Sequence, residues 1–299
     1  MISFFSNIFG YILNVIYEIV KNYGLAIILF SILLKILLLP LTIKQQKTLK
    51  KSQKLQGKLK ELQDKYSNNP EKLNQEMMDL YKRENLSPFS GCLSSIIQII
   101  LLLAMFYLVS KPLTYMKKID AEEINTYKEA IVQEQGENSV STTYPEISII
   151  KYINNKIDNP EENVEENKID INENLYINMN FLGLDLSAIP KDNYKDWKVY
   201  IIPLLYIVSS CISIKMTQVQ SKEKNKKDNK EEKTKNNEPD MTEQINKSMT
   251  WMMPILAVSV SLIAPLGLAL YWLINNILMI IERFIIDKVI VLKEEEKNA

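Results

Sequence analysis

A lysine within an otherwise uncharged run is the residue whose type and position most suggest chemistry in this sequence. Residues 24–43 are free of charge apart from Lys35. At about 1.5 Å of helix per residue, Lys35 would lie well inside the hydrocarbon zone of a membrane. A lysine at such a depth costs on the order of 2.5–3.5 kcal/mol, so these residues usually face a water-filled cavity or a partner. We favour binding of an acidic group over the alternative, in which Lys35 snorkels to the cytoplasmic surface.

Polar side chains in the other apolar runs could join this lysine. For the serines among them, hydrogen bonding between helices is the favoured interpretation. Gln98, Asn275 and Asn276 cost more to bury and therefore indicate a wet interior. Tyr271 and Trp272 could instead belong to an aromatic belt at the membrane surface. The candidates are Ser94, Ser95, Gln98, Ser209, Ser210, Ser213, Tyr271, Trp272, Asn275 and Asn276.

The composition excludes several classes of site. The sequence has no histidine, which excludes a histidine-based catalytic triad, an imidazole-ligated zinc ion and a histidine pH switch. Cys92 and Cys211 lie far apart in apolar runs and form no CxxC motif. Lys plus Arg and Asp plus Glu each number 36, so the whole chain has no basic field for nucleic acid. We therefore expect no metal, no cofactor and no enzymatic activity.

Apolar runs long enough to cross a membrane occupy much of the chain. A bilayer core needs roughly 20 apolar helical residues, and four runs approach or exceed that length. The last run, residues 249–281, is too long for one span, and Pro265 followed by Gly267 would break it. We predict five transmembrane helices, with the last two forming a hairpin, at residues 24–43, 91–111, 199–216, 249–264 and 265–286.

Basic residues in the connecting segments predict the orientation in the membrane. Residues 44–90 are rich in lysine, so we place them in the cytoplasm. The N-terminus and residues 112–198 then lie outside, whereas residues 217–248 and 287–299 lie inside. The expected protein therefore crosses the membrane several times and has its C-terminus in the cytoplasm.

Residues 44–90 have a regular spacing of apolar residues that a simple charged linker would lack. Leucines recur at helical spacing on both sides of residues 67–70, which predicts two amphipathic helices joined by a turn. Asn69 would cap the second helix, and Pro70 would be its first residue. We expect the apolar faces of this hairpin to pack on each other. Its lysines would lie in solvent or contact anionic lipid or an RNA backbone.

The other polar segments are less regular. Residues 1–23 gather apolar side chains on one helical face, which favours an interfacial helix over the alternative of a cleaved signal peptide. Residues 112–198 form a long outer loop that we expect to be partly disordered. Residues 217–248 have low complexity and are expected to be disordered.

Several short motifs, taken in order, resemble the YidC/Oxa/Alb family of membrane protein insertases. They cover most of the chain outside its two polar insertions, and together they are a stronger signal than any one of them alone. The motifs are NYGLAIIL (22–29), KILLLPL (35–41), LKELQDKY (59–66), KLNQEMM (72–78), PFSGC (88–92) with Gln98, FLGLDL (181–186), MMP (252–254) and GLALYW (267–272) with Asn275 and Asn276.

The resemblance implies an all-α membrane protein with five transmembrane helices around a hydrophilic groove, and with a cytoplasmic helical hairpin. The groove would open to the cytoplasm and to lipid and would be closed on the outer side. Such a protein is a membrane protein insertase and chaperone of the bacterial plasma membrane. It would take the polar N-terminal part of a nascent membrane protein into the groove and release the hydrophobic segment into the lipid bilayer, alone or with the Sec translocon.

The resemblance also implies roles for single residues. Lys35 matches the basic groove residue of the family, although the bacterial pattern is usually arginine, whose bidentate fork lysine lacks. Gln98 would line the groove, and Tyr271 or Trp272 would touch the passing segment. The expected groove residues are Lys35, Ser94, Gln98, Ser213, Tyr271, Trp272 and Asn275. Contact with a ribosome or another partner is expected at Lys54, Lys58, Lys60 and Lys65 of the hairpin.

Two other functions are compatible with the residues alone. A transporter could use Lys35 as an anion site, but the inverted repeats and broken helices typical of transporters are not visible. An intramembrane protease could pair Ser94 or Ser95 with Lys35, which is chemically feasible but rests on common residues. We favour the insertase.

Overall fold

The computed structural model describes residues 2–84, 90–159, 172–228, 252, 255 and 258–298. These residues are largely helical, and their only paired strands form one short antiparallel β-hairpin, β1 (Asn180–Phe181) and β2 (Leu184–Asp185). Together with the membrane-length helices, this confirms the all-α membrane protein predicted from the sequence. The main helices are α1 (Ile2–Val20), α2 (Tyr23–Lys65), α3 (Pro70–Arg83), α4 (Ser90–Ser110), α5 (Ala121–Gln135), α6 (Pro145–Asp158), α7 (Ile201–Asp228) and α9 (Leu266–Asn298).

Four helical stretches are long and apolar enough to cross a membrane within the described residues. They are Ile2–Val20, Tyr23–Thr48, Trp197–Met216 and Leu266–Ile286, and a shorter apolar stretch, Ile99–Ser110, lies in α4. The first of them coincides with the segment for which we predict an interfacial helix, so its length and composition also allow a span. Residues 258–263 are helical, and the helix ends at Ala264 and Pro265 before α9 begins. The count of five spans stays a prediction.

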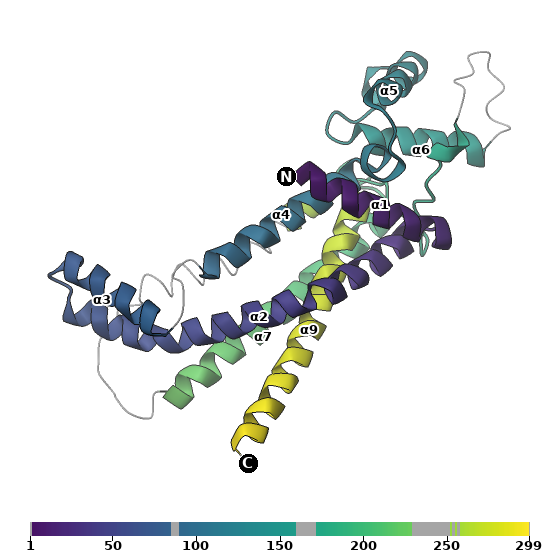
Figure 1. Cartoon of the computed structure of the whole chain (residues 1–299). Coiled ribbons are helices and arrows are strands. Elements are labelled where there is room, and N and C mark those ends of the chain that lie inside the picture. Colours follow the sequence, from purple (N-terminus) through teal and green to yellow (C-terminus); the bar gives the residue numbers. More distant parts are fainter. Residues whose placement is uncertain are drawn as a thin grey trace.

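Helix α2 is a single helix of 43 residues. It continues from the apolar segment into the first arm of the hairpin without interruption at residue 43, and the chain turns back only after Lys65 (Figure 1). The change at residue 44 is one of polarity, and Lys, Gln and Leu all favour helix. Pro40 stands inside the helix, where it supplies no N–H to the preceding turn.

The turn between α2 and α3 has the capping geometry that the sequence predicts. The Asn69 side chain accepts a hydrogen bond from the Lys72 N–H at 3.1 Å, and Pro70 opens α3. Glu71 in the first turn lies near the positive end of the helix dipole. None of the residues of α3 is fully buried. Leu55 in the first arm of the hairpin is nevertheless buried. Figure 1 shows the hairpin at the opposite end of the molecule from α5 and α6.

Helix α1 packs closely against α4 and against the π-helical turn η1 (Leu113–Lys117). The Ser6 hydroxyl donates a hydrogen bond to the Ala104 carbonyl of α4 at 3.0 Å. Gly10 lies against the Tyr115 carbonyl so closely that a Cβ built on Gly10 would lie 2.0 Å from that oxygen. The close contact of α1 with η1 therefore depends on glycine at position 10.

The end of the bundle at which α2 and α9 begin is covered by residues 172–200, and we call it the capped end. The Leu266 N–H donates to the Ala188 carbonyl and the Gly267 N–H to the Leu186 carbonyl, each at 2.9 Å. These bonds satisfy donors at the start of α9 that have no partner within the helix. The loop thus holds the first turn of α9 in place.

The same loop also holds the start of α2. The Tyr23 N–H donates to the Asn178 carbonyl at 3.0 Å. Phe181 of β1 packs directly on Gly24, where an added Cβ would lie 2.4 Å from the Phe181 ring. Both membrane helices are therefore tied to one short segment at the capped end.

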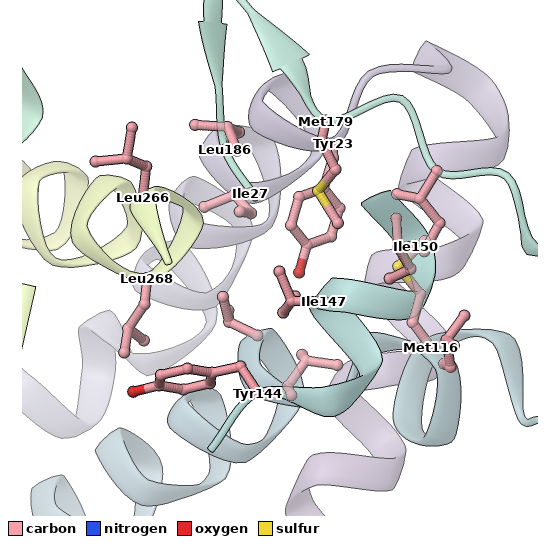
Figure 2. Close-up of a cluster of buried hydrophobic side chains, with 14 of the residues drawn as sticks. Tyr23, Ile27, Met116, Tyr144, Ile147, Ile150, Met179, Leu186, Leu266 and Leu268 are labelled. Atoms are coloured by element: carbon pink, nitrogen blue, oxygen red, sulfur yellow. The ribbon is translucent and has the colours of Figure 1, made fainter. Parts of the chain in front are cut away.

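Residues 117–159 differ from the expectation of a partly disordered loop. They form α5 and α6, and both helices contribute to the buried core. Figure 2 shows Ile147 and Ile150 of α6 beside Tyr23 of α2 and Met116 of η1. The isoleucines interspersed among the polar residues supply this buried face, and the average composition of the segment conceals them. Residues 160–171 lie outside the described part of the chain.

Glu146 of α6 is a buried carboxylate at this junction. Its Oε2 accepts from the Thr114 N–H at 3.0 Å and its Oε1 from the Thr114 hydroxyl at 2.6 Å. Burial raises the pKa of Glu146 above its ordinary value of 4.5, and the hydrogen bonds from Thr114 oppose that shift. The carboxylate therefore links α6 to η1, and the free-energy cost of burying its charge depends on pH.

We expect Glu146→Gln to change the pH dependence of stability. In the unfolded chain Glu146 loses its proton near its ordinary pKa of 4.5, but in the folded chain it does so at a higher pH. Glu146 therefore destabilises the fold as pH rises from about 4.5 through its raised folded pKa. The glutamine oxygen can still accept from the Thr114 N–H, and its NH2 group can donate to the Thr114 hydroxyl oxygen. Because glutamine does not titrate, the variant should gain stability relative to the original chain over this range. Melting temperatures in detergent across pH check this, and a constant difference would contradict it.

Candidate functional site

Lys35 forms an ion pair with Glu282 of α9. The Lys35 Nζ lies 3.0 Å from the Glu282 Oε2, and the side chains are 28% and 9% exposed. Lys35 lies about 18 Å along α2 from Tyr23, at about 1.5 Å per residue. Both residues belong to stretches long and apolar enough to span a membrane. The pair therefore places two opposite charges within the membrane-crossing part of the bundle.

The acidic group that Lys35 binds in this structure is a residue of the same chain, Glu282. The sequence does contain the signal, because Glu282 is an acid near the end of the last apolar run. The two residues are separated by 247 positions, however, and only the packing of α9 against α2 brings them together. Sequence reasoning identified Lys35 and missed its partner as a site residue.

A second polar cluster joins α9 to α7, about 9 Å along α9 from Glu282 at about 1.5 Å per residue. The Asn276 side-chain amide donates to the Ser209 hydroxyl at 2.9 Å and to the Ser210 hydroxyl at 3.1 Å. All three residues are buried. The hydrogen bonds account for the burial of Asn276, so this cluster supports packing between the helices, as predicted for the serines.

We expect Asn276→Leu to destabilise the fold by about 1 kcal/mol, because it removes both bonds between α9 and α7. Asn275 provides a matched control, since its amide donates at 3.0 Å to the Tyr271 carbonyl of its own helix. Asn275→Leu should therefore cost less. Chemical or thermal unfolding in detergent would measure the two losses. Equal losses would contradict a special role for the contact between the helices.

Tyr271 and Trp272 lie in the bundle near the capped end. Tyr271 is buried, and the Trp272 ring packs on Tyr206 of α7 with the ring centroids 6.4 Å apart. The Trp272 Nε1 is buried and has no hydrogen-bond partner among the described residues. The contacts of Trp272 with Tyr206 and of Asn276 with the two serines show that α7 and α9 run parallel.

The structure gives less information about the remaining predicted groove residues. Ser94 and Gln98 lie on α4, but their side chains are outside the described part. Ser213 is buried on α7, on the side of the helix that carries Ser209 and Ser210. The structure therefore joins Lys35 to Glu282, and α7 to α9, without showing one continuous groove.

The hairpin lysines have the expected exposure where they are described. Lys58 forms an exposed ion pair with Glu84 at 2.9 Å, and the Lys65 ammonium lies 5.2 Å from the centroid of the Tyr66 ring. The side chains of Lys54 and Lys60 are outside the described part. Exposed pairs of this kind contribute little stability, so these lysines remain available to a partner.

The fold and the site define a multi-pass membrane protein with a partly buried ion pair between two membrane-length helices. The family described as 60Kd inner membrane protein matches residues 15–294. The chain belongs to this family, and the resemblance to YidC-type proteins inferred from the sequence is confirmed.

Two relatives show how far the similarity extends. A protein named membrane protein insertase YidC from Treponema denticola is 29% identical over 278 residues, which are 93% of this chain and 36% of that protein. A protein of the same name from Francisella tularensis subsp. novicida is 39% identical over 109 residues, or 36% of this chain and 20% of that protein. The chain thus spans about a third of the length of the first relative and matches a smaller part of the second.

Proposed function

We propose that this chain inserts membrane proteins into the lipid bilayer and assists their folding there. In this proposal the polar end of a nascent segment binds beside Lys35, and the hydrophobic part then moves sideways into lipid. The observation that carries it is the Lys35–Glu282 pair inside a bundle of membrane-length helices, in a chain of this family. Two paired charges give a polar segment a place to bind at a depth where lipid offers none.

The energetics of this route need no nucleotide. Transfer of the substrate's apolar side chains into lipid yields roughly 25 cal/mol per Å² of buried surface. The obstacle is the polar end, which has to pass the hydrocarbon region. A charged site partway along α2 would lower that barrier without supplying the driving force.

The cap formed by residues 172–200 supports a route that enters from the other end. That loop is hydrogen-bonded to the first turns of α2 and α9. We place the capped end outside the cell and the lysine-rich hairpin in the cytoplasm, since basic segments favour the cytoplasmic side. A nascent chain would then approach from the side of the hairpin.

Partners follow from this arrangement. The proposed substrates are nascent membrane proteins, which the chain would insert into the lipid bilayer. The Sec translocon is a proposed partner. The exposed hairpin, with Lys58 and Lys65, is the proposed contact for a ribosome. An RNA backbone would attract these lysines in a salt-dependent manner.

Site-specific photo-crosslinking tests the proposal directly. A photoreactive residue is placed at position 35, 98 or 272, and the protein is exposed to a stalled ribosome that carries a single-span nascent chain. Crosslinks that follow the hydrophobic segment as the chain lengthens would support insertion and trace its path. If the folded protein gives no crosslink at any of these positions, the proposal fails, and solute flux in liposomes becomes the next assay for the transporter alternative.

The protease alternative receives no support from the described contacts. It needs Lys35 to act as a base for Ser94 or Ser95. The Lys35 Nζ donates to the Glu282 Oε2 at 3.0 Å, and the side chains of Ser94 and Ser95 lie outside the described part. We therefore propose binding and release without covalent chemistry.

A further inference from the structure

The two carboxylate oxygens of Glu282 have different surroundings. Oε2 accepts a hydrogen bond from the Lys35 Nζ at 3.0 Å. Oε1 is buried and has no hydrogen-bond partner among the described residues, and the residue as a whole is 8% exposed. Buried polar atoms in native proteins are nearly always satisfied. A carboxylate oxygen at this depth, without a donor among the described residues, is therefore able to accept a hydrogen bond from a ligand.

The chemistry of lysine explains why the oxygen is left free. The lysine ammonium is a compact point charge, whereas the planar guanidinium of arginine can donate to both oxygens of a carboxylate at once. Lys35 reaches only Oε2 of Glu282. A lysine at this position therefore offsets the charge of Glu282 and donates to only one of its two oxygens.

We propose that Oε1 of Glu282 is a second substrate position, which binds a basic side chain in the polar end of the inserting segment. This assignment rests on the proposed insertase function. A lysine or arginine of the substrate would displace the side chains that cover Oε1 and supply the donor that this oxygen lacks, and the pair with Lys35 would stay intact. An acidic side chain of the substrate would instead compete with Glu282 for the Lys35 ammonium.

The proposal changes the class of substrate that the site accepts. An isolated Lys35 would attract acidic tails and repel basic ones, since like charges at close range oppose each other. The pair has no net charge and offers one group of each sign. The chain should therefore insert proteins with basic or mixed polar tails as well as proteins with acidic tails.

A charge-matched set of substrates tests this specificity. The purified full chain is placed in liposomes without a membrane potential, because a potential would itself favour acidic tails over basic ones. Single-span substrates that differ only in one tail residue, Asp, Lys or Gln, are offered, and protease protection measures the translocated tail. The variants are Glu282→Gln, which removes the negative charge, and Lys35→Arg, whose fork would occupy both oxygens.

The original chain should translocate both the Asp tail and the Lys tail. Glu282→Gln should reduce translocation of the Lys tail by roughly ten-fold, the effect of losing one charged hydrogen bond, and should preserve or increase that of the Asp tail. Lys35→Arg should also lower the translocation of the Lys tail relative to that of the Asp tail, although this variant keeps both charges. Melting temperatures of both variants verify that they are folded.

Different failures have different meanings. If the original chain inserts the tails but neither variant changes the ratio between the Lys and Asp tails, Glu282 only positions Lys35 and the assignment is overturned. If Glu282→Gln lowers the translocation of the Lys tail and of the Asp tail equally, the same conclusion holds. If the original chain inserts none of the substrates, the proposed function itself is wrong and the assignment falls with it.

Discussion

Lys35→Glu is expected to abolish insertion of a substrate with an acidic tail and to destabilise the fold. The substitution places a second carboxylate beside Glu282, which now bonds to Lys35 at 3.0 Å. Removing one partner of a fully buried ion pair typically costs about 3–5 kcal/mol, because the other charge is left uncompensated. This pair is only partly buried, so its loss should cost less. The added like charge acts in the same direction. Thermal unfolding in detergent and protease-protected insertion in liposomes measure the two effects.

Two further variants separate stability from function. Exchanging the charges in Lys35→Glu/Glu282→Lys restores an ion pair between α2 and α9 and should recover most of the lost stability. Lys35→Ala removes the cation without adding a negative charge and should also prevent insertion. If Lys35→Glu melts at the original temperature, the ion pair does not stabilise the folded protein. If Lys35→Ala and Lys35→Glu both insert normally, Lys35 does not bind the substrate.

Gly10→Ala is expected to loosen α1 from the rest of the protein. The added Cβ would lie 2.0 Å from the Tyr115 carbonyl oxygen and 2.5 Å from its carbon. These are backbone atoms, so no side-chain rotation can relieve the clash, and overpacking of this kind costs about 1–3 kcal/mol. The nearby bond from Ser6 to Ala104 should weaken as α1 shifts. Limited proteolysis of α1 and the melting temperature measure the change.

Gly57→Ala provides the matched control. Gly57 lies in α2 with no other atom near the position of an added Cβ. Alanine there should stabilise the helix by about 0.5–1 kcal/mol, because glycine is the poorer helix former. The two Gly→Ala substitutions should therefore have opposite signs. If Gly10→Ala is as stable as Gly57→Ala, the close contact of α1 with η1 does not contribute to stability.

Local patterns determined a large part of this protein. The length of each apolar run predicts a membrane protein because a bilayer needs a certain length of helix. Asn69 and Pro70 predict the start of α3, since capping involves only neighbouring residues. The motifs around Lys35 led to the correct family. In each case the signal lies within a few turns of one helix.

Contacts between distant segments were decided only by the tertiary structure. Whether Glu282 faces α2, α7 or lipid depends on the rotation and depth of α9, which the apolar composition of that helix leaves open. The folding of α5 and α6 likewise depends on a buried surface shared with α2 and η1, so their polar average was misleading. Hydropathy and capping act over a few residues, whereas an ion pair across 247 positions exists only after the helices have packed.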